Sequence, residues 1–242
     1  MKIEIWSDFV CPFCYIGKRR LEEALTQFEN RDEVKLEFKS FELDPNSPKD
    51  SKQSMQEVLA SKYGMSIEKA KEMNAGIGEQ AASVGLTFNF DNMKPTNTFD
   101  AHRLAHFAKK LGKDAQLTEK LLYAYFTESK NVADKDVLAD IAETVGVTRE
   151  EALTVLNDEQ AYADDVRFDQ KTAQQIGVRG VPFFVINQKY AISGAQTPET
   201  FLGAIQKAWT EANTAPVLED VSGSNAEDTS CTDDGCAVPD DK

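Results

Sequence analysis

The pattern of apolar and polar residues predicts strands at the two ends of the chain and helices between them. Alternation over residues 2–7 and 34–43, with helical spacing between these runs, predicts a strand–helix–strand opening. Two further alternating runs, over residues 181–187 and 189–194, predict a pair of strands around a tight turn. A final helix follows and runs to Trp209, with a proline in its first turn.

Between these strands, almost every segment has the spacing of an amphipathic helix. Thr148 and Glu151 form the sequence pattern of a capping box. Glycines stand where five helices should end, namely Gly64, Gly85, Gly112, Gly146 and Gly177. The predicted helices span residues 53–63, 67–84, 99–111, 115–129, 135–145, 149–156 and 159–176. Because the outer pieces are each too small to be a domain, we expect one α/β unit with the helices inserted in its middle.

The charge of the chain argues against several classes of partner. Of its 242 residues, 27 are Lys or Arg and 41 are Asp or Glu, which gives a formal net charge of −14. Nucleic acid and anionic lipid both need a positive surface, so neither is expected to bind. No apolar run is long enough to cross a membrane, and the first residues lack the pattern of a secretory signal. We therefore expect a cytoplasmic protein with no nucleic-acid or membrane partner.

From residue 211 onward the composition changes. This segment carries nine acidic residues and one lysine, with few large apolar side chains, which is typical of a disordered tail. It accounts for −8 of the net charge of −14, so the rest of the chain is only moderately acidic. The predicted organisation is an α/β unit from residues 1–44 and 177–210, an inserted helical domain over residues 45–176, and an acidic tail over residues 211–242.

The four cysteines fall into two local pairs. Cys11 and Cys14 form a C-x-x-C motif, and Cys231 and Cys236 form a C-x4-C motif in the tail. In a reducing compartment such pairs are more often catalytic, regulatory or metal-binding than structural. Zinc at the first pair would need about two more ligands, and the chain offers only the tail pair or its two histidines. This count favours a redox dithiol, so we expect no metal and no cofactor.

The position of the first pair carries a chemical prediction. A strand followed by Cys-Pro-x-Cys at the start of a helix places the Cys11 sulfur near unpaired backbone N–H groups and the positive end of the helix dipole, which favour a thiolate. The helical geometry places Cys14 behind Cys11. We therefore expect Cys11 to attack a substrate disulfide and Cys14 to resolve the resulting mixed disulfide.

Four segments of the sequence resemble one protein family. Residues 7–18 (SDFVCPFCYIGK) resemble the active-site segment of the DsbA-like thioredoxin family, in particular its FrnE-type branch. Residues 177–186 (GVRGVPFFVI) and 193–196 (SGAQ) are similar to the second signature of that family, and residues 97–106 (NTFDAHRLAH) are similar to a further family segment. The resemblance extends over roughly residues 1–210, and the order of the motifs agrees with the predicted elements.

The resemblance implies a thioredoxin fold, β-α-β followed by β-β-α, with a helical insertion. It also implies a cis peptide bond between Val181 and Pro182, opposite the Cys11 sulfur, which keeps metal off the dithiol and leaves the Val181 backbone open to a substrate strand. The sequence alone equally allows an ordinary edge-strand proline. Exposed apolar surface at Pro12, Phe13 and Val181 is expected to contact protein substrates that contain disulfides, with a thiol as the electron donor.

Two positions depart from the pattern of related enzymes. Thioredoxin-like enzymes often place a buried carboxylate six residues before the nucleophile, where this chain has Ile5, with Glu4 and Asp8 nearby. The sequence therefore assigns no proton acceptor for Cys14. Phe13 replaces the histidine that strongly oxidising members carry between their cysteines. Because phenylalanine cannot donate a hydrogen bond to a thiolate, we expect a less oxidising dithiol; a reduction potential near the ≈ −120 mV of DsbA would contradict this.

The tail pair and the histidines leave several interpretations open. Cys231 and Cys236 could exchange disulfides with the first pair, which the family resemblance favours; they could also bind a soft metal weakly, or belong to a spacer without function. His102 and His106 share one face of a predicted helix, which fits a partly buried face better than a metal site. By family resemblance, His102 would help to shape a substrate cleft.

Two other functions fit parts of the sequence. Glutathione-dependent isomerases and kappa-type glutathione transferases share the helical-insertion architecture, but they typically carry serine at the position of Cys11. A metal-buffering or chaperone-like binding module would act through the acidic, cysteine-containing tail. The two cysteines of the C-x-x-C motif favour a third function, a cytosolic thiol–disulfide oxidoreductase that reduces or isomerises disulfides in proteins.

Overall fold

The structure is a computed structural model that describes residues 1–214 of the chain. The first of its two compact units is Met1–Ala212, which contains every helix and strand discussed below apart from the last residue of the final helix. Cys231 and Cys236 lie outside the described residues, as does most of the predicted acidic tail.

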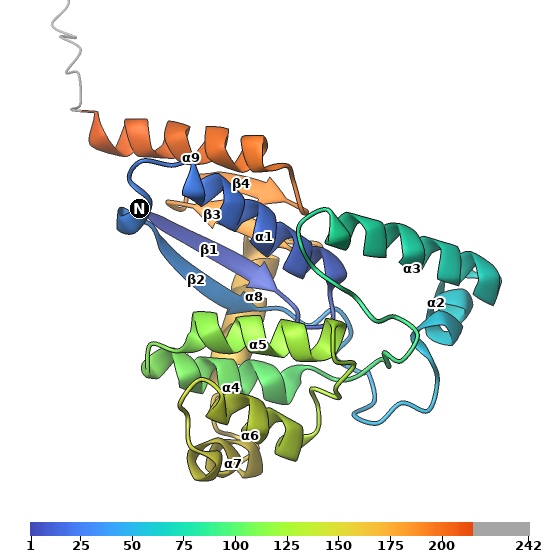
Figure 1. Cartoon of the computed structure of the whole chain (residues 1–242). Helices are drawn as coiled ribbons and strands as arrows, with labels where there is room; N and C mark the ends of the chain where they lie inside the picture. The colour runs from blue at the N-terminus through green and yellow to red at the C-terminus, as the bar shows by residue number, and fades with distance from the viewer. Residues whose placement is uncertain (215–242) are drawn as a thin grey trace, which may run out of the picture. The chain divides into compact units, whose positions relative to one another are not determined.

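A four-stranded sheet carries the site, with strand order β2-β1-β3-β4. β1 pairs with β2 in parallel, while β3 pairs with β1 and β4 in antiparallel fashion. Helix α1 (Pro12–Thr26) connects the two parallel strands and α9 (Pro198–Asn213) follows the last strand. The strands are β1 (Lys2–Ser7), β2 (Lys35–Ser40), β3 (Phe183–Ile186) and β4 (Tyr190–Ser193). This order is the β-α-β and β-β-α arrangement that the sequence predicts (Figure 1).

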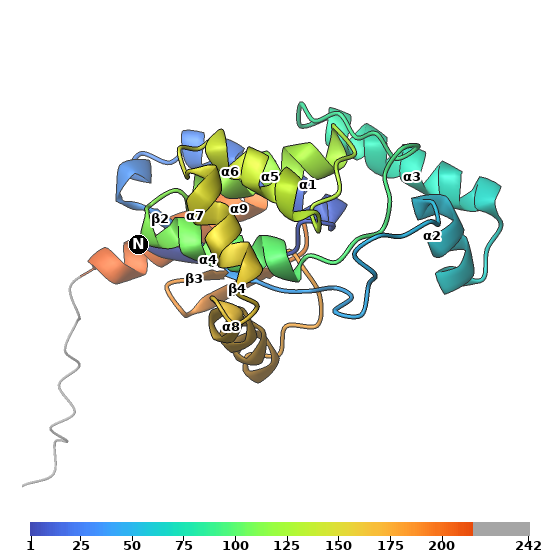
Figure 2. The same ribbon diagram turned by 90° about the horizontal axis from the view of Figure 1, so that it is seen from below.

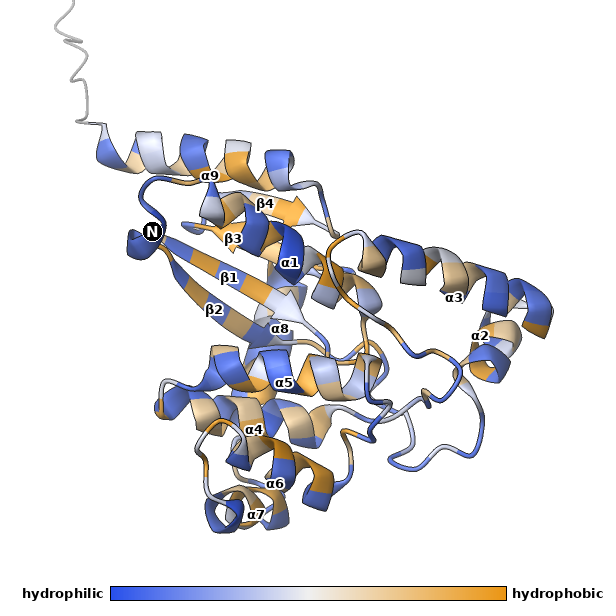
Figure 3. Cartoon of the chain, in the orientation of Figure 1, coloured by the Kyte–Doolittle hydropathy of each residue, from blue (hydrophilic) through white to orange (hydrophobic). Residues whose placement is uncertain are grey.

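Alternation along β1 separates the two faces of the sheet, as the stripes of polar and apolar residues in Figure 3 show. Ile3 and Ile5 pack with Phe184 against α1 and α9. Trp6 points to the other face, which helix α8 (Ala163–Gln175) covers (Figure 2). Its indole Nε1 donates a 3.0 Å hydrogen bond to the Asp169 carbonyl, so both faces of the strand that leads to the C-x-x-C motif are anchored.

Between β2 and α8, the described chain forms two groups of helices. Helices α4 to α7 share one apolar core, to which Leu104, Leu122 and Leu138 contribute buried side chains. Helices α2 and α3 pack against each other and lie to one side, near α1 (Figure 1). The helices are α2 (Met55–Tyr63), α3 (Ile67–Ala82), α4 (Phe99–Lys110), α5 (Asp114–Phe126), α6 (Lys135–Glu143) and α7 (Arg149–Asn157).

The predicted signals for the ends of elements are present in the structure. Thr148 and Glu151 form a capping box at the start of α7, and all five of the predicted helix-ending glycines have positive φ. Asn187 and Gln188 also have positive φ, at 48° and 56°, which makes the predicted tight turn between β3 and β4. Several boundaries differ by a few residues. The final helix, predicted to run to Trp209, runs to Asn213. The helix predicted to start at residue 159 starts at Ala163, because Tyr162 adopts the left-handed conformation at φ 60°.

Among residues 1–214, no helix is long and apolar enough to cross a membrane.

Candidate active site

Cys11 lies at the point where the first strand turns into the first helix. Its backbone N–H donates to the Asp8 carbonyl at 3.1 Å, which closes a tight turn after β1. Cys11 is the N-cap of α1, a helix of 15 residues, and Pro12 fills the first turn, where a missing N–H costs nothing. The first turn of α1 carries no acidic side chain. The positive end of the helix dipole therefore acts on the Cys11 sulfur without a competing negative charge in that turn.

The two sulfurs differ in access. Both residues are nearly buried, with 4% of Cys11 and 3% of Cys14 exposed, and both are free thiols. Cys11 lines a large groove, whereas Cys14 is not among the residues that line it. Burial raises the pKa of the Cys14 thiol, and the neighbouring Cys11 raises it further, which outweighs hydrogen bonds from Ser7 and the Asp8 backbone. Cys14 is therefore held as a protonated thiol behind Cys11.

The loop before β3 faces the first sulfur. The Cys11 thiol lies 3.4 Å from the Val181 carbonyl oxygen, and the peptide bond between Val181 and Pro182 is cis. Gly17 allows α1 to approach this loop closely, because a Cβ atom at that position would lie 3.1 Å from the Pro182 ring and 3.3 Å from Phe184. The helix that carries the cysteines and the loop that faces them are thus packed directly together.

A groove of about 740 Å³ opens beside Cys11. Its near wall includes Pro12, Phe13 and Val181, and its far wall comes from α2, α3 and residues 90–98. Four of the five methionines of the chain line it, namely Met55, Met65, Met73 and Met93. Methionine side chains are flexible and polarizable, so they adapt to apolar groups of different shapes. The groove therefore offers an adaptable, largely apolar surface beside Cys11.

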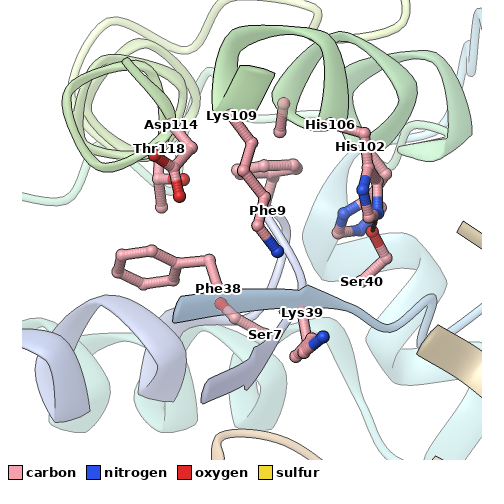
Figure 4. A pocket seen from close by; sticks show the side chains of 11 residues that line it. Ser7, Phe9, Phe38, Lys39, Ser40, His102, His106, Lys109, Asp114 and Thr118 are labelled. Carbon is pink, nitrogen blue, oxygen red and sulfur yellow. Dashed lines mark hydrogen bonds between the residues drawn. The ribbon is translucent and has the colours of Figure 1, made fainter. Parts of the chain in front are cut away.

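A second, small cavity of about 20 Å³ lies between the end of β2 and helix α4 (Figure 4). Ser7, Ser40, His102 and His106 are among the residues that line it, together with the ring of Phe9. This volume is enough for one water molecule, since a water needs roughly 10–15 Å³ measured in this way, and it is too small for a substrate.

The two histidines share a helix face but meet different carboxylates. His102 Nε2 lies 3.4 Å from Asp8 Oδ1, whereas His106 Nε2 lies 3.1 Å from Asp169 Oδ2 and 3.1 Å from Ser40 Oγ. Burial alone would raise the pKa of Asp169, but hydrogen bonds from His106 and the Ser40 backbone outweigh it and lower that pKa. Within residues 1–214, no three His, Cys, Asp or Glu side chains come together in a way that could hold a metal ion.

Comparison with known proteins places these features in a family. Residues 2–206 match the model of the DSBA-like thioredoxin domain. The chain belongs to this family. Its fold is therefore a DsbA-like thioredoxin fold with a helical insertion, and its family is one of thiol–disulfide oxidoreductases. The FrnE-type branch is a finer assignment that the family match does not reach.

Two relatives match this DSBA-like chain over most of their length. The probable DsbA oxidoreductase SCO1869 from Streptomyces coelicolor is 42% identical, and its crystal structure has a TM-score of 0.85, covering 99% of this chain and 100% of its own. The uncharacterized protein YwbO from Bacillus subtilis is 32% identical over 205 residues, which cover 84% of this chain and 94% of YwbO.

A more distant structure shares the fold. The cytosolic disulfide reductase DsbM from Pseudomonas aeruginosa, solved with GSH, is 14% identical with a TM-score of 0.58, covering 88% of this chain and 97% of its own. At this identity the likeness concerns the fold alone.

Within residues 1–214, the candidate residues predicted from the sequence come together; the tail pair lies outside the described residues. Cys11, Pro12, Phe13 and Val181 line one groove, Cys14 lies behind Cys11, and Pro182 packs on Gly17. The sequence alone does not predict the wall that α2 and α3 contribute. The four methionines within residues 55–93 were the available signal, because methionine is otherwise rare in this chain.

Proposed function

We propose that this protein catalyses thiol–disulfide exchange on protein substrates, with Cys11 as the nucleophile and Cys14 as the resolving thiol. The observation that carries the proposal is the difference between the two sulfurs. The Cys11 sulfur lies at the helix N-terminus, beside the Val181 carbonyl and in the groove. Cys14 lies behind Cys11, and its raised pKa keeps it a thiol until a mixed disulfide forms, as expected of a resolving cysteine.

The exchange proceeds in two balanced steps. The Cys11 thiolate attacks a substrate disulfide; a Cys11–substrate bond forms, the substrate S–S bond breaks, and one substrate sulfur leaves as a thiolate. Cys14 then attacks Cys11, which forms the Cys11–Cys14 disulfide and releases the second substrate sulfur. The substrate gains two electrons and the dithiol loses two, so an external thiol must reduce the dithiol again. In isomerisation, another cysteine of the substrate replaces Cys14 in the second step.

We propose that the dithiol works in the cytoplasm as a reductase or isomerase. Phe13 offers no hydrogen-bond donor to a Cys11 thiolate, so the reduced form lacks one source of the stabilisation that makes a dithiol strongly oxidising. DsbM is an example of a cytosolic disulfide reductase with the same fold.

Insulin reduction with dithiothreitol as donor tests this function and shows whether the tail cysteines contribute to it. We expect the full-length protein to accelerate insulin reduction, and we expect Cys231→Ser/Cys236→Ser to retain most of that rate because the first dithiol carries the exchange. We propose that the tail pair exchanges with the first dithiol when the donor is a protein or glutathione. No acceleration by the wild type would contradict the proposed function, and loss of activity in the tail variant alone would make the tail pair the primary dithiol.

The groove makes a separate prediction about substrate size. Tyr63 on α2 and Met73 on α3 line it and are 59% and 37% exposed. We expect Tyr63→Ser/Met73→Ser to lower kcat/KM for insulin about tenfold, which corresponds to roughly 1.4 kcal/mol of lost apolar contact. A small aromatic disulfide should react at an unchanged rate, since it needs only Cys11. Tyr123→Ser is the control, because Tyr123 is 45% exposed on α5 and is not among the groove residues. An equal loss with both disulfides would contradict a role for the groove in binding polypeptides.

A further inference from the structure

Helix α3 carries a buried asparagine on an otherwise apolar face. Its buried residues are Ala70, Asn74 and Ala81, which recur at helical spacing, and the partly buried Ile77 lies on the same face. Asparagine is a poor residue for the middle of a helix, because its side chain competes with the backbone for hydrogen bonds. The presence of Asn74 on this face therefore needs a reason other than the stability of the helix.

The amide of Asn74 is buried without a partner. Within residues 1–214, its Nδ2 atom donates no hydrogen bond, and only 3% of the residue is exposed. A buried donor without a partner destabilises the folded state. The carboxamide NH2 group is uncharged and carries two donors at any pH, so a change of protonation cannot satisfy it. The partner has to come from outside the chain, as a ligand or as a water molecule.

Asn74 lines the groove that opens beside Cys11. In the far wall of the described groove, its Nδ2 is the buried side-chain atom that lacks a partner. Thr96 lines the same wall and is also buried, but its hydroxyl donates to Asn131 Oδ1 at 2.6 Å. The torsion that turns a carboxamide is broad, and Nδ2 breaks no hydrogen bond of its own when it turns toward the groove. Asn74 can therefore donate to a molecule bound there.

Helix α3 also leaves space for a polypeptide next to Asn74. Gly76 lies in the interior of this helix, where glycine is less stable than alanine. It lines the groove, and a Cβ atom at this position would meet no described atom within 4 Å beyond the backbone of its own helix. The missing side chain therefore lets a ligand approach the helix closely.

The chemistry of the proposed substrate determines what Asn74 would bind. A polypeptide that is bonded to Cys11 has to place the residues beside its own cysteine in the groove, because Cys11 lines it. Each of those residues brings a main-chain N–H and C=O, which are costly to bury between apolar side chains without partners. The carboxamide of Asn74 offers both a donor and an acceptor, so it matches a peptide group.

We propose that Asn74 is a substrate-binding residue whose carboxamide forms hydrogen bonds with a main-chain peptide group of the polypeptide that is bonded to Cys11. This inference rests on the proposed function. Every residue type presents the same peptide group, so this contact requires a polypeptide but does not select its sequence. The methionines of the groove accommodate different side chains, while Asn74 recognises the main chain. Asn74 thus favours polypeptide disulfides over small ones.

Replacement of Asn74 by leucine tests the contact, because leucine keeps the branch at Cγ and has neither donor nor acceptor. In the full-length protein with dithiothreitol as donor, the ratio of kcat/KM for insulin to kcat/KM for a small aromatic disulfide should fall about tenfold in Asn74→Leu. The midpoint of urea unfolding should stay at or above the wild-type value, because a buried donor without a partner has been removed. A purely structural role would lower the midpoint and leave the ratio unchanged.

Thr118→Val is the matched control. Thr118 Oγ1 is likewise buried without a partner among the described residues, and valine replaces the hydroxyl by a methyl group. Thr118 lies on α5 and lines the small cavity instead of the groove. The ratio of the two kcat/KM values should therefore keep its wild-type value in Thr118→Val. An equal fall in both variants would overturn the inference.

Peptide disulfides with one main-chain ester test recognition of the main chain directly. An ester lacks the N–H donor of the amide that it replaces, and the ester is moved through the positions beside the substrate cysteine. At one of these positions it should lower kcat/KM of the wild type about fivefold, as expected for loss of one hydrogen bond. The same ester should cost Asn74→Leu less than about twofold, because the partner is already missing. Equal costs in both proteins at every position would overturn the inference.

The remaining outcomes separate this inference from the proposed function. If Asn74→Leu keeps the wild-type ratio, the carboxamide does not bind the substrate and the inference is overturned. If the variant slows reaction with glutathione disulfide as much as reaction with insulin, Asn74 binds small thiols instead, and the inference is again overturned. If Asn74→Leu does not fold, Asn74→Ala decides by the same ratio. If the wild type forms no mixed disulfide with insulin through Cys11, the proposed function fails instead.

Discussion

Replacement of Cys11 by serine is expected to abolish disulfide exchange, whereas replacement of Cys14 by serine is expected to preserve the first attack and trap a mixed disulfide. Only a thiolate is a competent nucleophile here, and a serine hydroxyl at the N-terminus of α1 does not ionise near neutral pH. Loss of a catalytic nucleophile costs on the order of 10³-fold or more. We therefore expect Cys11→Ser to reduce insulin no faster than dithiothreitol alone.

Cys14→Ser distinguishes the two sulfurs from each other. Because Cys11 alone lines the groove, the variant should still form one covalent bond to a substrate cysteine, and without Cys14 this bond should persist when no external thiol is present. Mass spectrometry of the non-reduced adduct measures it, and Cys11→Ser mixed with the same substrate is the control. If Cys11→Ser formed the adduct and Cys14→Ser did not, the assignment of the two roles would be reversed. If Cys11→Ser reduced insulin as fast as the wild type, glutathione transfer or metal binding would become the leading functions.

The sequence predicts the parts of the site that depend on local order. Cys11 and Cys14 follow a strand and open a helix, so their spacing and context define the dithiol without knowledge of distant contacts. The turn at Asn187 and Gln188 is likewise a local signal. Val181 reaches the Cys11 sulfur across 170 residues of sequence, and only the family resemblance connects the two positions.

The parts that the sequence does not predict depend on packing between distant segments. Asp8 and His102 face each other because α4 packs beside the turn after β1, and no periodicity encodes that contact. Helix α8 has the same spacing of apolar residues as the inserted helices. It nevertheless covers the sheet, where its Ala173 packs in one cluster with Trp6 of β1. The groove wall on α3 depends on how α2 and α3 pack beside α1. The amphipathic pattern of each helix does not predict this packing.

The helix that carries His102 is fixed by one buried arginine. Arg103 is 1% exposed and forms an ion pair with Asp100 at 2.7 Å. Its guanidinium also donates to the carbonyl groups of Val155 and Leu156, which α7 leaves without partners at its C-terminal end. Further donations reach two carbonyls in the turn between α7 and α8, those of Asp158 and Ala161. One side chain thus joins α4 to the end of α7 and the start of the segment that leads to α8.

Arg103→Ala is therefore expected to lower the free energy of unfolding by about 3–5 kcal/mol, the usual cost of removing one partner of a buried ion pair. Urea denaturation followed by circular dichroism measures it, and Arg149→Ala is the matched control. Arg149 pairs with two aspartates on the surface, so its loss should cost below about 1 kcal/mol. Equal costs for the two variants would contradict the role of Arg103.

The effect of Arg103→Ala should also depend on pH. Burial would raise the pKa of the Asp100 carboxyl, but hydrogen bonds from Lys49 and Arg103 outweigh it, so this pKa is lowered. A lowered pKa in the folded state contributes stability above the ordinary value near 4, and this contribution is lost as the pH falls through the lower value. The variant lacks the part of this contribution that Arg103 supplies, so its deficit relative to the wild type should be largest near neutral pH and shrink in acid. A deficit that stayed constant down to pH 3 would assign the loss to the four carbonyl contacts rather than to the ion pair.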